Sequence, residues 1–329
     1  MLVCQEMPLR SKKEARPRLI WERPWLPLQS ALMRLRLRRI RATIVCVLLV
    51  FLAFIPASAA PWTVHSQPVR LLNGAPVLFQ VKPPVTLESL SATWLDHQIS
   101  FSFDPSTKTW FALAGANFET KPGKYPLQLT GERRSNKAPI TFTRTFTIAA
   151  AKYPKIRAKL TVEGKFTEPS PEQLKQIDED QKTKRDYLNR VTPDREWSGS
   201  FAPAAHAAIS DGFGSQRIFN DKAQRPHYGL DYRVPTGTSV AAMNSGTVLV
   251  ARFLYFEGNC VVIDHGQGLL TLYFHLSELK VKEGEAVKRG QEIGFSGGTG
   301  RATGPHLHVA VRWQGTYLDP ARLMQLSLP

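Results

Sequence analysis

The chain has 329 residues, which is more than one ordinary domain requires, so we expect two domains. Its 43% hydrophobic and 10% aromatic residues suffice for packed cores and exclude a disordered chain. The formal net charge is +16, but residues 1–42 hold eleven Lys/Arg against three Asp/Glu, so +8 belongs to that segment and +8 to the remainder. A remaining charge of this sign favours an anionic surrounding such as the cell envelope. Nucleic acid is not favoured, because no basic helix or RNA-binding aromatic motif is present.

We interpret residues 1–59 as a dispensable extension followed by a secretory signal, with translation starting at Met33. Five arginines lie between Arg34 and Arg41, the apolar run Ile44–Ile55 follows, and Ala57-Ser58-Ala59 fits a cleavage site. An uncleaved anchor is the alternative, but the run is shorter than the ~20 residues of a spanning helix. We therefore expect secretion across the inner membrane to the periplasm or cell envelope, with only transient membrane association through the signal segment.

Residues 60–150 are predicted to form an immunoglobulin-like β-sandwich that serves as an accessory domain. The segments 77–81, 99–103 and 140–142 mix β-branched and aromatic residues at a period of two, which is typical of strands. Turn residues such as Asn73-Gly74 separate these segments. Short strands spaced regularly over ninety residues favour a sandwich, and we find no catalytic pattern among them.

Residues 151–196 are predicted to be a linker that contains a helix. Ser170 is a suitable N-cap, Pro171 suits the first helical position, and Gln173 completes a capping box. Few apolar residues lie among many charged ones, so we expect the helix to lean on one domain as a spacer and to end at Pro193.

Residues 197–329 hold six of the eight histidines and are rich in glycine and strand-forming residues. His227 and Asp231 are four residues apart in an extended segment, so their side chains point to one face. His306 and His308 are two apart and share a face for the same reason. His275 closes the apolar strand that contains Leu272-Tyr273-Phe274.

This set of side chains fits a catalytic zinc site. Zinc takes imidazole and carboxylate ligands, and a catalytic site supplies three of them with one open position. His227, Asp231 and one member of the His306/His308 pair meet that count, and the spacing leaves open which member binds. The remaining two histidines could handle protons during hydrolysis of an amide by zinc-bound water.

The C-terminal region closely resembles the lysostaphin/LytM-type zinc metallopeptidases, many of which are peptidoglycan endopeptidases. The resemblance begins at Phe213-Gly214-Ser215-Gln216-Arg217, covers about a third of the chain and is specific in combination. The residues that carry it further are His227-Tyr228-Gly229-Leu230-Asp231, Pro235-Thr236-Gly237-Thr238-Ser239-Val240, Val262-Ile263-Asp264-His265-Gly266, Tyr273-Phe274-His275-Leu276, Gly297-Gly298-Thr299-Gly300 and Gly304-Pro305-His306-Leu307-His308.

The resemblance implies that His227, Asp231 and His308 bind one Zn²⁺ per chain, and that His275 and His306 are the catalytic pair outside the metal shell. It implies a mainly β chain with a β-rich metallopeptidase domain at 197–329. The expected substrate is the amide bond of peptidoglycan cross-links, with cell-envelope regulators as further partners.

Two alternatives stand beside this hypothesis. A cell-wall-binding or amidase-activating regulator could use the same fold without hydrolysis, but all five positions are intact. The segment 281–294 resembles the strand rhythm of lipoyl or biotin carriers, but it lacks their lysine in a tight hairpin.

Overall fold

Strands dominate the computed structural model, which describes residues 61–154, 157–223 and 225–329. The predicted mainly β class is confirmed. Among these residues, no helix combines the length and the apolar character needed to cross a bilayer. The predicted extension and signal segment lie outside the described residues.

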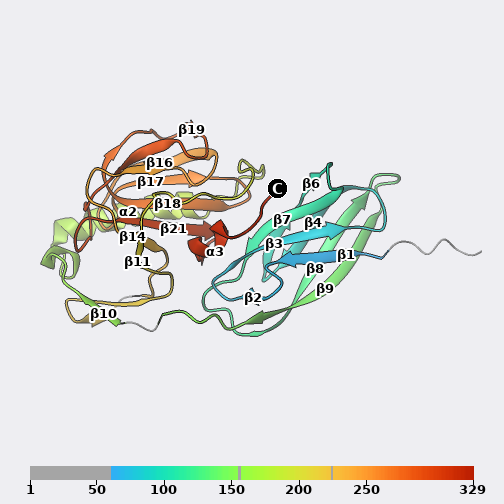
Figure 1. The fold of residues 1–329 in the computed structure, drawn as a ribbon, viewed down its shortest axis with the longest axis horizontal. Helices are drawn as coiled ribbons and strands as arrows, with labels where there is room; N and C mark the ends of the chain where they lie inside the picture. The colour runs from blue at the N-terminus through green and yellow to red at the C-terminus, as the bar shows by residue number, and fades with distance from the viewer. Residues whose placement is uncertain (1–60, 155–156, 224) are drawn as a thin grey trace, which may run out of the picture. The chain divides into compact units, whose positions relative to one another are not determined.

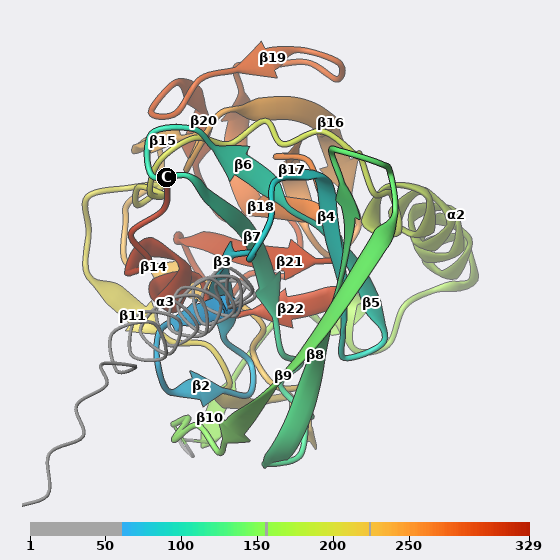
Figure 2. The same cartoon turned by 90° about the vertical axis from the view of Figure 1, so that its right-hand side faces the viewer.

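The N-terminal part, residues 61–149, consists of two sheets (Figure 1). The first has the order β1 (Thr63–Gln67), β3 (Pro76–Lys82), β7 (Thr109–Gly115) and β6 (Ser102–Asp104). The second has the order β2 (Leu71–Leu72), β9 (Pro139–Ala149), β8 (Gly123–Arg133), β4 (Leu87–Trp94) and β5 (His97–Ser100). β8 and β9 form the long hairpin drawn in green in Figure 2.

The two sheets face each other through aromatic side chains. Phe79 of β3 lies edge-on to Trp94 of β4, with ring centroids 5.1 Å apart, and is also 5.1 Å from Phe146 of β9. Alternation along β3 and β4 directs these rings to the inner faces, where their burial stabilises the pair of sheets. The immunoglobulin-like character of this part stays a prediction.

Residues 99–103 form two strands instead of the single strand expected. β5 belongs to one sheet and β6 to the other, and the chain crosses between them at the buried Phe101. The Phe101 N–H donates to the Leu90 carbonyl at 2.9 Å, which ties the crossover to β4. Period-two patterning cannot reveal such a switch, because the apolar alternation continues through it.

The helix expected after Ser170 is α2 (Pro171–Leu188), and its capping box is present. Its C-cap is Asn189, so the helix ends before Pro193 instead of at it. Ile177, Tyr187 and Leu188 pack into apolar clusters that also contain side chains of the C-terminal part. The helix is therefore fastened to that part along its length.

The C-terminal part is built on one large antiparallel sheet. Its strands run in the order β11 (Ile209–Asp211), β14 (Leu230–Tyr232), β21 (Leu307–Trp313), β18 (Leu269–Leu279), β17 (Gly258–Asp264), β16 (Gly246–Leu254) and β19 (Ala286–Val287). Additional strands are β15 (Ser239–Ala241), β20 (Glu292–Ser296) and β22 (Thr316–Leu318), and α3 (Pro320–Met324) follows. A small sheet joins β10 (Arg157–Leu160), β12 (Gln216–Phe219) and β13 (Lys222–Ala223), and the 3-10 turn η1 (Gly164–Phe166) precedes α2.

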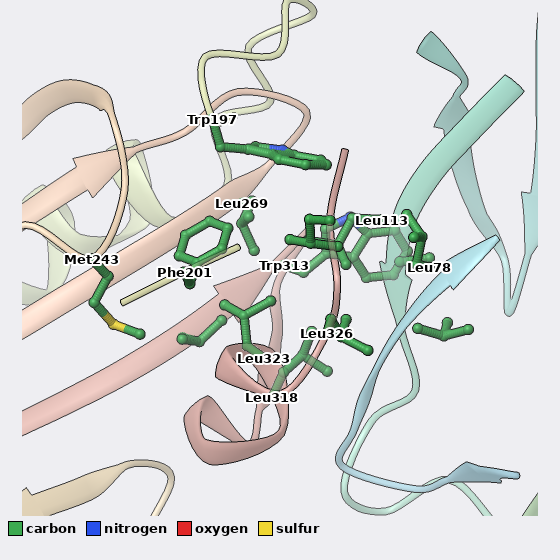
Figure 3. Close-up of a cluster of buried hydrophobic side chains, with 14 of the residues drawn as sticks. Leu78, Leu113, Trp197, Phe201, Met243, Leu269, Trp313, Leu318, Leu323 and Leu326 are labelled. Carbon is green, nitrogen blue, oxygen red and sulfur yellow. The ribbon is translucent and has the colours of Figure 1, made fainter. Parts of the chain in front are cut away.

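The largest cluster of buried apolar side chains runs through both parts, which belong to one compact unit. Figure 3 shows Leu78 and Leu113 of the first sheet among the side chains of Trp313, Leu318 and Leu326. These residues are buried, so the two parts share apolar surface that neither covers alone.

His265 lies in this core as a buried neutral side chain. Its Nδ1–H donates to the Ser245 carbonyl at 2.7 Å, and its Nε2 lies 2.7 Å from the Thr271 hydroxyl. Burial lowers the pKa of His265 from 6.5 to about 4. Its two nitrogens contact Ser245 and Thr271, which are not among the predicted ligands, so His265 has a structural role in the core.

This pKa difference predicts a loss of stability in acid. Between pH 6.5 and pH 4 the imidazole of the unfolded chain binds a proton while that of the folded chain stays neutral. The free energy of unfolding therefore decreases by about 2–3 kcal/mol as the pH is lowered through this range. We expect urea unfolding of metal-free protein at pH 7 and pH 4.5 to show this loss. His265→Gln should be less stable at pH 7 but should lose about that much less on acidification. Equal losses in both proteins would contradict the prediction.

Candidate metal centre and active site

Strand pairing places two of the predicted ligands directly opposite each other. Asp231 of β14 pairs with His308 of β21, and their side chains project from the same face of the sheet. The His308 Nδ1 lies 2.9 Å from the Asp231 Oδ1. Gly229 makes this approach feasible, because a Cβ there would lie 2.6 Å from His308 Cε1 and 2.6 Å from the Val309 carbonyl oxygen.

His227 completes the group from the segment just before β14. Its Nδ1–H donates to the Gly212 carbonyl at 3.0 Å, which leaves the Nε2 lone pair directed at the other two residues. The Nε2 lies 2.9 Å from His308 Nδ1 and 3.1 Å from Asp231 Oδ1. Two imidazole nitrogens and one carboxylate oxygen thus converge on one point, a geometry that can hold a metal ion.

Asp231 is held as a carboxylate. Burial alone would raise its pKa, but the imidazoles of His227 and His308 in contact with the carboxylate outweigh burial and keep the pKa below its usual range. Arg217 donates to the second oxygen of Asp231 and, at 2.6 Å, to Asp211. The sequence marks Arg217 only as the last residue of a family motif, and no motif marks Asp211.

His308 is neutral near pH 7 and fixed in orientation. Burial lowers its pKa to about 4, although the Asp231 carboxylate opposes this shift. Its ring stacks on Phe274 of β18, with centroids 5.3 Å apart and an angle of 7°. Phe274 pairs with His308 across the sheet, so the stacking follows from the strand register.

His275 faces the same site although it follows Phe274 directly in β18. Ordinary strand alternation would send the two side chains to opposite faces. His275 has φ +65°, a left-handed conformation that is rare outside glycine, and it breaks the alternation. Its main-chain N–H donates to the Glu257 carbonyl at 2.8 Å, and its Nδ1–H donates to the Thr299 carbonyl at 2.8 Å. Burial and the neighbouring His306 and His308 lower its pKa to about 3.

His306 lies two residues before His308, and its ring lies beside that of His275. Its ring centroid is 4.8 Å from that of His275, and its Nε2 is 3.9 Å from Asp231 Oδ1. Its Nδ1–H donates to the Gly304 carbonyl at 2.8 Å, so the Nε2 is free to exchange a proton. All five predicted site residues therefore lie together.

A cavity of about 390 Å³ opens over this group. His227, His275 and His308 line it together with Phe274, Glu257 and Arg225. Of the five predicted site residues, these three histidines lie in its wall, and its volume can hold a short peptide segment.

Residues 225–320, which contain all five side chains, match the profile of Peptidase family M23. This segment is an M23 peptidase domain. A crystal structure of a peptidase M23 from Pseudomonas aeruginosa has 27% identity and a TM-score of 0.59, over 78% of this chain and 95% of that one.

Curated relatives align over part of this chain and part of their own length. The peptidoglycan DD-endopeptidase ShyA of Vibrio cholerae is 32% identical over 61% of this chain and 41% of its own length. The DD-carboxypeptidase/endopeptidase Mpg of Neisseria meningitidis is 41% identical over 39% of this chain and 29% of its own length. The chain thus spans less than half of the length of these relatives.

Helix α2 supports the M23 domain at the loop that holds His275. The buried Asp180 accepts a hydrogen bond from the Tyr255 N–H at 2.6 Å, and Lys184 pairs with Glu257 at 2.9 Å. The carbonyl of Glu257 accepts a hydrogen bond from the His275 N–H, so Lys184 of the helix is linked to His275 through Glu257. The expectation of a simple spacer did not include this role, because the helix sequence does not show which loop it touches.

Gly229→Ala should lower the free energy of unfolding by about 1–3 kcal/mol, because the added methyl would overlap the Val309 backbone and His308. Thermal or urea unfolding measures the change. Gly164→Ala is the matched control, since a Cβ at Gly164 meets nothing within 4 Å. Equal stability of Gly229→Ala and wild type would contradict the close approach.

Asp180→Ala should cost about 1–3 kcal/mol of stability, because it leaves the Tyr255 N–H buried and unpaired. Asp178→Ala, on the same helix, removes only an exposed ion pair with Lys182 and should change stability by less than about 0.5 kcal/mol. Urea unfolding of both variants provides the comparison. A larger loss in Asp178→Ala than in Asp180→Ala would show that α2 is not fastened through Asp180.

Proposed function

We propose that the chain is a zinc-dependent endopeptidase that hydrolyses amide bonds in the peptide cross-links of peptidoglycan. The observation that carries this proposal is the convergence of His227, Asp231 and His308 on one point, with His275 and His306 beside it. Membership of the domain in a peptidase family supports hydrolysis, and the names of the relatives support peptidoglycan as the substrate.

The three converging side chains fit zinc by their chemistry and spacing. Ligand atoms at about 2.0–2.2 Å from a tetrahedral zinc ion lie about 3.3–3.6 Å apart. Here the three contacts are 2.9, 2.9 and 3.1 Å, within a few tenths of an ångström of that spacing. Bound zinc would lower the pKa of a water to about 7 and polarise the scissile carbonyl.

The remaining imidazoles handle protons. In the neutral state both His275 and His306 donate Nδ1–H to a backbone carbonyl, which leaves each Nε2 as an acceptor. One of the pair takes the proton of the attacking water on its Nε2. The other, once protonated at its Nε2, donates to the developing oxyanion or to the leaving amine. The low pKa of His275 suits a group that is neutral at the start of the reaction.

Arg217 and Phe274 position the ligands. Arg217 fixes the Asp231 carboxylate from behind, and the stacked Phe274 ring fixes the plane of His308. Such neighbours keep the ligand atoms converged and exclude water from the base of the site.

The proposed place of action is the periplasm or cell envelope. The relatives named for peptidoglycan support this location, and so do the predicted signal segment and the +8 charge outside residues 1–42. A regulator without hydrolysis is not favoured, because all five side chains are present and lie together.

Purified protein should contain about one zinc ion per chain and release cross-link fragments from sacculi. His308→Ala should lose both zinc and activity, because it removes a ligand. His306→Ala should keep zinc and lose activity by at least about a hundredfold, as expected for a proton-transfer group. Metal analysis and chromatography of the released muropeptides measure the two effects.

The exposed His206 provides the control, and His206→Ala should behave as wild type. Zinc-loaded wild type that leaves sacculi unchanged would contradict the enzyme and favour the regulator. Full activity in His308→Ala would contradict the metal assignment.

A further inference from the structure

A second cavity, of about 510 Å³, adjoins the one lined by His227, His275 and His308. Arg225, Tyr228 and Glu257 line both cavities, so a ligand can extend from one into the other. Tyr228 forms part of the shared wall by stacking on Tyr317, with ring centroids 5.1 Å apart and an angle of 5°.

Four cations and two carboxylates line this second cavity, and the carboxylates already have partners. Glu257 pairs with Lys184 at 2.9 Å. Glu119 accepts a hydrogen bond from the Tyr228 hydroxyl at 2.7 Å. Four cations against two carboxylates leave the lining with an excess of two positive charges.

Three arginines remain, and they come from three separate elements. Arg185 lies on α2, Arg225 lies just before His227, and Arg312 lies on β21. Among the residues that the structure describes, none of the three has an acidic partner. Arg312 lies over the Tyr317 ring at 5.2 Å, and its buried Nε has no hydrogen-bond partner in the described part of the chain.

Uncompensated arginines around a hollow are a recognition feature for anions. The planar guanidinium matches a carboxylate with two parallel hydrogen bonds, and such charge-assisted bonds are about twice as strong as neutral ones. Like charges gathered around one hollow repel one another, and a bound anion would relieve that repulsion.

We propose that this cavity, which we call the arginine pocket, binds a free carboxylate of the substrate peptide and so selects acidic peptides for cleavage. The inference rests on the proposed peptidase function, because the ligand must run from the arginine pocket into the catalytic cavity. Arg185 and Arg225 are the exposed donors that a ligand meets first.

The test compares two synthetic cross-linked peptides that differ only in whether the carboxylates of the stem are free or amidated. Wild type should cleave the free acid with kcat/KM about 5- to 20-fold higher, mainly through a lower KM, because the contact is made before the chemical step. The double variant Arg185→Gln/Arg225→Gln should lose this preference, so that its kcat/KM values for the free acid and for the amide become equal.

Arg190→Gln is the matched control. Arg190 is exposed just beyond α2 and does not line the arginine pocket, so its variant should keep the wild-type preference. Equal cleavage of the two peptides by wild type would overturn the inference while leaving the peptidase function intact. An unchanged preference in the double variant would overturn it as well.

A binding measurement separates this inference from the proposed function. If wild type cleaves neither peptide, the peptidase proposal fails for these substrates. Calorimetry of both peptides binding to zinc-loaded His306→Ala protein still tests whether the arginine pocket recognises the free carboxylate. Tighter binding of the free acid, lost on Arg185→Gln/Arg225→Gln substitution in that background, supports carboxylate recognition, and equal binding of acid and amide overturns it.

Discussion

The pairing of β14 with β21 is the constraint on which the site depends. It sets Asp231 opposite His308, and the pairing of β21 with β18 sets His308 opposite Phe274. A slip of one residue in either ladder would turn His308 to the other face of the sheet and separate it from Asp231 and His227. The register is held by the buried neighbours of these residues, such as Leu307 and Val309, which alternate with the histidines and fill the core.

His275 shows where the regular sheet is not sufficient. A strand offers every second side chain to one face, yet the site uses both Phe274 and His275. The left-handed backbone at His275 resolves this conflict, and such a conformation costs about 1–3 kcal/mol at a residue other than glycine. Hydrogen bonds to the carbonyls of Glu257 and Thr299 offset that cost, and α2 holds the Glu257 loop from outside.

The N-terminal part helps to hold the same arrangement in place through the shared core. Leu78 and Leu113 share one buried cluster with Trp313 and Leu318, so the strand that carries His308 is packed on its far end by residues of both parts (Figure 3). The Tyr228 hydroxyl bonds to Glu119 of the loop after β7, directly beside His227. These contacts give the N-terminal part a physical connection to the site that its own sequence, without any catalytic pattern, does not indicate.

The sequence by itself determined the mainly β class, the capped helix after Ser170 and the five candidate site residues, because strand periodicity, capping chemistry and metal-ligand spacing are local properties. Periodicity missed the crossover at Phe101, since the apolar alternation continues through it. Only the tertiary structure decided that Arg217 and Asp211 lie behind Asp231, that His275 leaves the strand pattern and that α2 reaches the Glu257 loop. Each of these joins residues distant in sequence or depends on a backbone angle that neighbours impose, so no local pattern encodes it. The arginine pocket belongs to this second class, because its three guanidiniums come from three elements that meet only in the folded chain.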